Sequence, residues 1–289
     1  MHARVLSLAL VFSSIAAYAQ QQTLTAEQVI AKMCDAAHIT VAVDTVDSVK
    51  AGDPATVVSG IATTIWPTMD VLRKAVAAGD NLIVTHEPSF YNHLDATNLY
   101  PSDAVVAEKL KYIADHKLVL FRWHDGAHGR QPDFIMEGWK AKAGWATAHR
   151  NPGEPMLYTS APVTIAALAA QLKKATGAQA VRVVGDPKLT VTKLAYAPGA
   201  PGAARQIKTL ERDDVEVLVA GEIPEWETIA YAEDASQQGR HKALILMGHY
   251  TSEEPGMQTV ADWLKSVVPG MKVDFIPAGE PYWLASPKP

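Results

Sequence analysis

The chain has 289 residues, 48% of them hydrophobic and 20% charged, which is an ordinary composition for a globular protein with a sizeable core. Its net charge is −5 and no block of Lys and Arg stands out, so the usual signature of a nucleic-acid-binding protein is missing. The single cysteine, Cys34, excludes an intramolecular disulfide.

The first residues have the pattern of a secretory signal peptide. A basic residue, Arg4, precedes the apolar run Val5–Ala17, and small residues lie on both sides of Tyr18 before Gln20. The run is shorter than the roughly 20 residues that span a bilayer, which argues against a membrane anchor. We therefore expect cleavage after Ala19 and an exported chain, periplasmic or secreted, that has no membrane contact once the signal is removed.

Helix and strand patterns alternate through the first half of the chain. Amphipathic periodicity and helix-start residues predict helices at Thr25–Ala37, Thr68–Ala78, Ala104–His116 and Asp133–Ala143. Apolar runs predict strands at Val57–Ile65, Asn81–Thr85 and Leu118–Arg122. Such alternation is typical of βαβ units and a largely parallel sheet.

A stretch with Pro and Gly, His149–Pro155, interrupts this alternation and marks the predicted boundary between two lobes. The signal peptide would occupy residues 1–19, the first α/β lobe 20–150 and the second 151–289, with the C-terminal segment contributing to a metal site between the lobes. In the second lobe, helices are predicted at Pro162–Thr176, Ala204–Glu211, Trp226–Gln238 and Pro255–Val267. Strands are predicted at Ala180–Val184, Val191–Tyr196, Val215–Ala220, Ala243–Met247 and Met271–Pro277.

Residue types that bind metals follow four of the predicted strands. They are, in chain order, His86, Glu87, His124, Asp125, His128, Glu222, His249 and Glu253. In open α/β sheets, ligands bind beyond the carboxyl ends of the strands. Imidazole and carboxylate groups together suit Zn, Mn, Fe or Co, and two such ions bridged by a carboxylate can activate a water for hydrolysis.

Each of these residues also has an ordinary structural explanation. A lone histidine after a strand is often a hydrogen-bonded turn residue, and Asp125-Gly126 alone is typical of a turn. Glu254, beside Glu253, is expected to be an ordinary acidic residue in the first turn of a helix. Four such strand ends in one chain favour a metal site over separate explanations. The sequence has no GxGxxG motif after a strand, P-loop, GxSxG or HExxH motif. The stretch Gly199–Ala204 precedes a helix and could cradle an anion, although a flexible turn is the simpler interpretation.

Several of these segments resemble the Nif-three-like dinuclear metal-centre proteins, often described as GTP cyclohydrolase I type 2 homologues. THEPSF resembles the family's His-His-Pro motif after a strand, and HDGAH resembles its His-x-x-x-Asp motif. AGEIPEW is similar to a Gly-Asp/Glu strand end, and GHYTSE matches the Gly-His-Tyr/Phe-x-(Ser/Thr)-Glu motif in full. The similarity spans most of Ile30 to Ala278.

The resemblance implies two similar, intertwined three-layer α/β/α lobes with two divalent metal ions at their junction, and a ring-shaped hexamer. His86, His249 and Glu253 would be ligands, with Glu253 as the bridge. Two positions depart from the family pattern. Glu87 replaces the second histidine and His128 replaces the aspartate, but both residue types bind metals, so the site would be re-ligated and not lost.

The remaining site residues are assigned by the same resemblance and their neighbourhood. Asp125 is an alternative ligand, His124 would position substrate or support a ligand, and Glu222 would transfer protons or support a ligand. We expect an exported metal-dependent hydrolase of a small molecule. GTP ring opening is disfavoured because an exported protein meets little GTP.

Two alternatives stay open at this point. A non-catalytic, oligomeric metal-binding scaffold would explain the altered ligands equally well. A periplasmic solute-binding protein would explain export and two lobes, but the His and Glu residues at the strand ends argue against it.

Overall fold

The computed structural model describes residues 23–39, 44–145, 149–151 and 154–285. The predicted signal peptide therefore lies outside the described residues. Among the helices in these ranges, none is long and apolar enough to cross a membrane.

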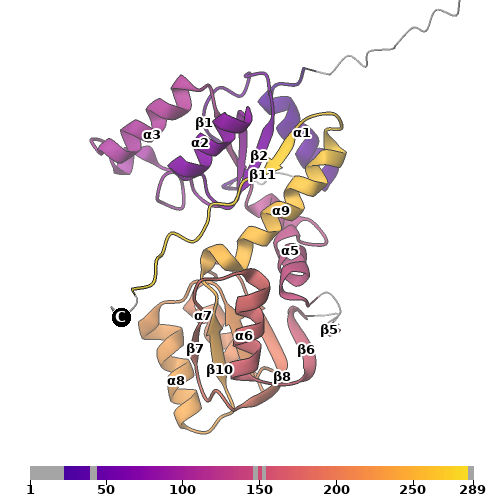
Figure 1. Cartoon of the computed structure of the whole chain (residues 1–289), viewed down its shortest axis with the longest axis vertical. Helices are drawn as coiled ribbons and strands as arrows, with labels where there is room; N and C mark the ends of the chain where they lie inside the picture. The colour runs from indigo at the N-terminus through magenta and orange to yellow at the C-terminus, as the bar shows by residue number, and fades with distance from the viewer. Residues whose placement is uncertain (1–22, 40–43, 146–148, 152–153, 286–289) are drawn as a thin grey trace, which may run out of the picture.

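Two β-sheets divide the described chain into an upper and a lower lobe (Figure 1). The first sheet has the order β1-β4-β3-β2-β11, with bounds Val49–Ala51, Val119–Arg122, Leu82–Thr85, Ile61–Thr64 and Val273–Phe275. The second has the order β5-β6-β8-β9-β10-β7, with bounds His149–Asn151, Glu154–Thr164, Thr190–Ala197, Val217–Ala220, Ala243–Leu246 and Arg182–Val184. Four strands of the first sheet are mutually parallel, and in the second the parallel core is β8-β9-β10.

Helices cover both faces of each sheet. In the first lobe, the core on one face contains α1 (Ala26–Ala37) and α9 (His249–Val267), and the core on the other contains α2 (Met69–Ala78) and α3 (Ala104–Asp115). In the second lobe, the corresponding pairs are α5 (Phe134–Ala143) with α6 (Ile165–Thr176), and α7 (Ala203–Leu210) with α8 (Ala230–Gln237). The prediction of two three-layer α/β/α lobes is confirmed. The shorter helices are η1 (Thr97–Leu99), α4 (Asp125–Gly129) and η2 (Glu225–Ile229).

Three local features differ from the sequence-based expectations. The stretch predicted as a lobe boundary contains β5 and the start of β6, which pair as antiparallel strands. The helix predicted from Pro162 begins at Ile165, because the preceding residues belong to β6 and Thr164 caps the helix. The final strand β11, placed by prediction in the second lobe, pairs with β2 in the first sheet.

Helix α9 joins the two lobes (Figure 1). It begins at His249, six residues before the predicted start at Pro255, so this proline lies inside the helix. A proline in that place removes one backbone hydrogen bond. Close packing of α9 on α5 offsets this cost: a Cβ at Gly138 would lie 2.5 Å from Gly256 Cα, so the two helix backbones meet without intervening side chains.

Gly138→Ala should lower the free energy of unfolding by about 1–3 kcal/mol, since the added methyl group would force α5 and α9 apart. Urea unfolding curves of the wild type and the variant would measure the difference. Gly129→Ala is a suitable control, because its Cβ would meet nothing closer than Ile39 Cδ1 at 3.9 Å. Equal losses in the two variants would contradict the proposed close contact.

Candidate metal centre

The predicted site residues converge where the two lobes meet. His86 and Glu87 follow β3, while His124 and His128 lie at the start and within the short helix α4 that follows β4. From the second lobe, Glu222 follows β9, and His249 and Glu253 lie in the first turns of α9 after β10. Strand ends from both sheets therefore supply the site, as expected for parallel α/β sheets.

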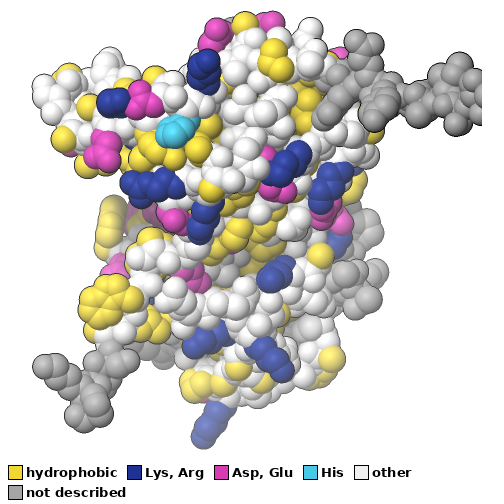
Figure 2. Space-filling model, turned by 45° about the horizontal axis from the view of Figure 1, so that its top comes forward, with side chains coloured by type: hydrophobic (Ala, Val, Ile, Leu, Met, Phe, Trp, Pro, Cys, Tyr) yellow, Lys and Arg dark blue, Asp and Glu magenta, His cyan; other side chains and the backbone are white. Residues whose placement is uncertain are grey.

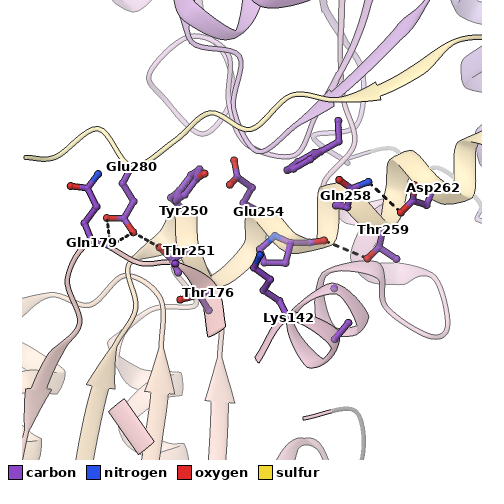
Figure 3. A pocket seen from close by; sticks show the side chains of 15 residues that line it. Lys142, Thr176, Gln179, Tyr250, Thr251, Glu254, Gln258, Thr259, Asp262 and Glu280 are labelled. Atoms are coloured by element: carbon purple, nitrogen blue, oxygen red, sulfur yellow. Dashed lines mark hydrogen bonds between the residues drawn. The ribbon is translucent and has the colours of Figure 1, made fainter. Parts of the chain in front are cut away.

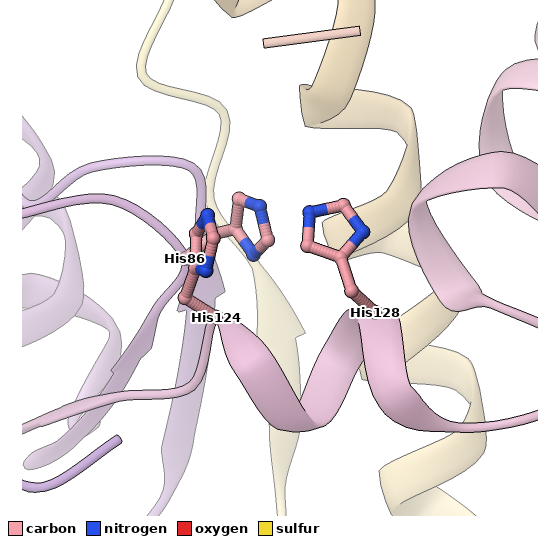
Figure 4. Close-up of side chains that lie close together, drawn as sticks. All are labelled: His86, His124 and His128. Carbon is pink, nitrogen blue, oxygen red and sulfur yellow. The ribbon is translucent and has the colours of Figure 1, made fainter. Parts of the chain in front are cut away.

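Three imidazole rings form the centre of the cluster (Figure 4). The His86 ring stacks on that of His124 with 4.6 Å between centroids, and His128 stands edge-on to both at 5.0 Å. One ring nitrogen from each of the three histidines lies within 4.8 Å of the others. Three converging imidazoles are a ligand set that suits zinc and similar transition metals.

His86 is the most deeply buried member of this cluster. Its side chain has no exposed surface, and neither ring nitrogen has a hydrogen-bond partner in the structure. Burial, followed by the neighbouring His128 and His124, holds its pKa well below the usual 6.5, so the ring is neutral. An unpaired polar group in the interior is costly, whereas a neutral imidazole with a free lone pair fits a metal ligand.

Glu253 lies between histidines of both lobes. Its Oε2 is 3.0 Å from His249 Nε2 and 3.6 Å from His86 Nε2, and its Oε1 is 4.0 Å from His128 Nε2. This is where a bridging carboxylate would have to lie. Glu253 also forms a second potential metal-binding group with His86 and Glu87.

Glu87 is the second inward carboxylate. Its Oε1 lies 3.3 Å from His249 Nε2 and 3.7 Å from His124 Nε2. Burial alone would raise its pKa, but His249 and the other histidines outweigh this and lower the pKa to about 2. Glu87 is therefore ionised and able to act as a ligand at the position where a histidine would be expected.

Three further carboxylates orient the histidines from outside. Asp125 accepts a hydrogen bond from His124 Nδ1 at 2.9 Å, Asp133 from His128 Nδ1 at 3.0 Å, and Glu222 from His249 Nδ1 at 3.0 Å. The other nitrogen, Nε2, faces the centre of the site, and that of His249 is engaged there with Glu253 Oε2 at 3.0 Å. Carboxylates in this position fix the tautomer of a metal-binding histidine and raise its basicity.

This arrangement refines three sequence-based assignments. Asp125 points away from the cluster, because its other oxygen accepts hydrogen bonds from Thr45 Oγ1 and the Val46 amide. Glu222, predicted to act in catalysis or support, contacts His249 Nδ1 with a side chain that is 64% exposed. His124, the other residue predicted as catalytic, contributes a nitrogen to the three-histidine group.

Two positioning residues were missed by the sequence analysis. Asp47 accepts hydrogen bonds from the backbone N–H groups of His124, Asp125 and Gly126 at 2.7, 3.0 and 2.7 Å. Asp133 caps α5 through the amides of Ile135 and Met136 while also holding His128. Asp133 was predicted only as the first residue of a helix, and nothing in the sequence links Asp47 to a segment nearly 80 residues later.

Arg122 holds the backbone behind His86. It is fully buried, and its Nε donates to the His86 carbonyl at 3.2 Å. Its guanidinium also lies 3.7 Å from Glu87 Oε2 and 3.4 Å from Asp95 Oδ2. Trp66 packs edge-on against the His249 ring with 5.8 Å between the ring centroids.

A cavity of about 650 Å³ opens over these residues. Glu87, His124, His128, His249 and Glu253 line one side, and the second lobe contributes Ala200, Pro201 and Arg205. This volume falls within the range of small-molecule binding sites.

The opposite side of α9 has a different role (Figure 3). Glu254, expected to be an ordinary first-turn acid, is buried and accepts a hydrogen bond from the Ala278 amide at 2.8 Å, so that expectation is wrong. Thr251 donates to Glu280, which also accepts a hydrogen bond from the Gln179 amide. These contacts fix the chain after β11 against α9 and the second lobe, beside a further cavity of about 570 Å³.

Asp47→Ala should weaken metal binding about 10- to 100-fold, the usual effect of losing a group that orients a ligand. It should also lower the free energy of unfolding by about 1–3 kcal/mol, because three backbone N–H groups, two of them partly buried, lose their acceptor. Competition with a chromogenic chelator would give the affinity. Asp53→Ala is the control, since Asp53 accepts one bond from Ala55 in an exposed turn. Wild-type affinity in Asp47→Ala would show that this carboxylate does not position the histidines.

The metal-free protein should become less stable as the pH rises above neutrality. Burial disfavours the His249 imidazolium, but Glu253 and Glu87 outweigh it and raise the pKa to about 11 from the usual 6.5. The stabilisation is complete below pH 6.5 and is lost as the pH rises toward 11. Urea unfolding of chelator-treated protein between pH 7 and 10 should show a decline that is smaller in His249→Gln. His116→Gln, at an exposed helix end, should retain the wild-type decline.

Comparisons with known proteins agree with the fold and the motifs. Residues 24–280 match the family described as Duf34/NIF3 (NGG1p interacting factor 3). A "GTP cyclohydrolase 1 type 2 homolog" from Chlamydia pneumoniae is 21% identical over 245 residues, covering 82% of this chain and 90% of the relative. A hypothetical protein from Staphylococcus aureus superposes with a TM-score of 0.69 at 15% identity, covering 91% of this chain and all of that one. A Bacillus cereus protein related to NIF3 gives 0.67 at 13% identity, with 91% and 100% coverage. The structural likenesses show the shared fold, and the match over residues 24–280 shows that this protein belongs to the Duf34/NIF3 family.

Proposed function

We propose that this protein is an exported, metal-dependent hydrolase that acts on a small molecule. The observation that carries the proposal is the His86 side chain, which is completely buried with both ring nitrogens unpartnered among further histidines and carboxylates. A metal ion is the partner that such a group lacks. Export is supported by the signal-peptide pattern before Gln20, and a homo-oligomer, specifically a hexamer, is supported by the family resemblance.

The residues present fit two divalent ions of the Zn, Mn, Fe or Co type. His86, His124 and His128 form one potential metal-binding group, and His86, Glu87 and Glu253 form another that shares His86. His249 lies within 3.3 Å of both glutamates and completes the second group. Bound ions of this kind supply Lewis acid chemistry, polarising a substrate oxygen and lowering the pKa of water.

The chain's own residues prepare this site in three ways. Asp125, Asp133 and Glu222 accept hydrogen bonds from Nδ1 of His124, His128 and His249, so that Nε2 of each ring faces the centre. Ionised Glu87 and the inward Glu253 supply negative charge that balances bound cations. The open cavity lets a small substrate approach the exposed edges of His124 and His128, which are 26% and 31% exposed.

A non-catalytic metal-binding scaffold is the alternative, and one observation favours it. The two residues predicted to be catalytic, His124 and Glu222, are engaged with Asp125 and His249. Neither residue is therefore free to act only as a general acid or base among the described residues of the cavity. Metal binding without substrate turnover is compatible with this geometry.

Metal analysis and turnover assays separate these functions. Natively exported wild-type protein should contain about two ions per chain and hydrolyse at least one amide, amidine or phosphate ester of a substrate panel. Glu253→Gln should lose metal and retain less than about a tenth of the activity. Glu254→Gln is the matched control, because this neighbouring glutamate faces the other side of α9.

The remaining outcomes are also informative. Bound metal with no turnover across the panel would support the scaffold, and wild-type protein without metal would contradict both functions. The mass of the exported chain tests the signal peptide, since cleavage after Ala19 leaves Gln20 as the first residue.

A further inference from the structure

The wall of the cavity opposite the first-lobe ligands is built by the loop between β8 and α7. Gly199 in this loop lies directly on Glu253, since a Cβ there would be 2.8 Å from the Glu253 carboxyl carbon. The Gly199 amide donates to Ser252 Oγ at 3.1 Å, and the Glu222 amide donates to the Gly199 carbonyl at 2.7 Å. The loop that the sequence suggested as a flexible turn is therefore fixed to the proposed metal ligands.

The first turn of α7 is fixed to the same strand end. Gln206 is buried, and its Nε2 donates to the Glu222 carbonyl at 2.8 Å while its Oε1 accepts from Thr228 Oγ1 at 2.9 Å. Glu222 in turn orients His249. Arg205, the residue before Gln206, is consequently anchored through its backbone relative to the metal centre, while its side chain lines the cavity.

Among the carboxylates and arginines that line this cavity, Arg205 is the one without a partner among the described residues. The lining carboxylates, Glu87, Asp125, Asp133 and Glu253, each contact a histidine. The other lining cation, Arg122, is buried against His86, Glu87 and Asp95. No hydrogen bond or ion pair joins the exposed Arg205 guanidinium to a described residue. A cation in a cavity of this kind is available to a ligand.

We propose that Arg205 binds an anionic group of the substrate, a carboxylate or a phosphate, and so determines specificity for small anionic molecules. Guanidinium groups bind both anions through two parallel hydrogen bonds, which would also orient the ligand. The first-turn N–H groups of α7, which no side chain caps, lie beside Arg205 and favour the same sign of charge. The orientation of a scissile bond toward the histidines and glutamates rests on the proposed hydrolase function, but the binding of the anion does not.

Isothermal titration calorimetry of the metal-loaded full-length mature protein tests this proposal with three related probes. Benzoate and phenyl phosphate carry the two candidate anions, and benzamide is their neutral counterpart. Wild-type protein should bind at least one anion about tenfold more tightly than benzamide, the ratio expected for one charge-assisted contact. The preferred anion then identifies the substrate class as carboxylate or phosphate.

Substitutions assign the effect to Arg205. Arg205→Ala should weaken binding of the preferred anion at least about tenfold, Arg205→Lys should restore part of it, and benzamide binding should not change. Lys208→Ala removes the same charge one turn further along α7, outside the cavity lining, and should bind like the wild type. Metal content and thermal unfolding should be the same in all variants, so that weaker binding cannot arise from a lost centre.

The outcomes separate this proposal from the hydrolase proposal. Equal anion affinity in Arg205→Ala and wild type, or no preference for an anion over benzamide, would overturn the role of Arg205 whether or not the protein hydrolyses a substrate. Arg205-dependent anion binding without turnover of any panel compound would leave this inference standing and count against the hydrolase. If turnover is found, Arg205→Ala should raise KM for anionic substrates and leave kcat and neutral substrates unchanged.

Discussion

The burial of the His86 imidazole is the constraint on which the rest of the site depends. A buried polar group without a hydrogen bond costs about 1–3 kcal/mol, and an apolar side chain would avoid that cost. The surrounding structure nevertheless holds His86 firmly, with β3 before it, Arg122 on its carbonyl and His124 stacked on its ring. A metal ion bound among these groups would supply the partner that no described side chain offers within hydrogen-bond distance.

The same constraint explains why the two lobes are joined as they are. The first lobe supplies the three clustered histidines and Glu87, whereas Glu253 and His249 arrive on a helix that follows the last strand of the second lobe. The close glycine contact between α5 and α9 and the pairing of β11 with β2 return that helix to the first sheet. Because the ligands come from both lobes, a bound ion would stabilise the junction, and loosening of the junction would weaken binding.

On the face that Figure 2 shows, Lys and Arg side chains are spread singly and not gathered in one patch, so positive charge that could attract a ligand is not concentrated there.

Much of the fold and part of the site could be predicted because they depend on local sequence. Apolar runs followed by polar residues identified the strand ends, and with them His86, His249 and Glu253. The β5–β6 pair was missed because Pro and Gly near residue 150 resemble a linker, and strand pairing depends on partners elsewhere in the chain. The early start of α9 was missed because Pro255 normally begins a helix, and only packing on α5 explains its place inside one. Asp47 acts on a segment nearly 80 residues later and Arg205 enters the cavity from the other lobe, so no spacing in the sequence reveals their roles, whereas Asp133 lies five residues after His128 at a predicted helix start.

The charge of the cavity links metal binding to the choice of substrate. Four carboxylates and two guanidinium groups line it, which gives a charge of −2, and the His249 imidazolium brings this to −1 in the metal-free protein. In that state the cavity repels anions, and Arg205 alone does not reverse its sign. A divalent ion bound in place of the His249 proton would make the lining neutral and a second would make it positive, so the affinity for an anionic group should grow with each ion bound. Replacement of a histidine by Glu87 and of an aspartate by His128, relative to the family pattern, leaves this balance unchanged. A site with these two replacements would therefore keep the charge that acts on an anionic ligand, while its changed ligand types would favour a different metal.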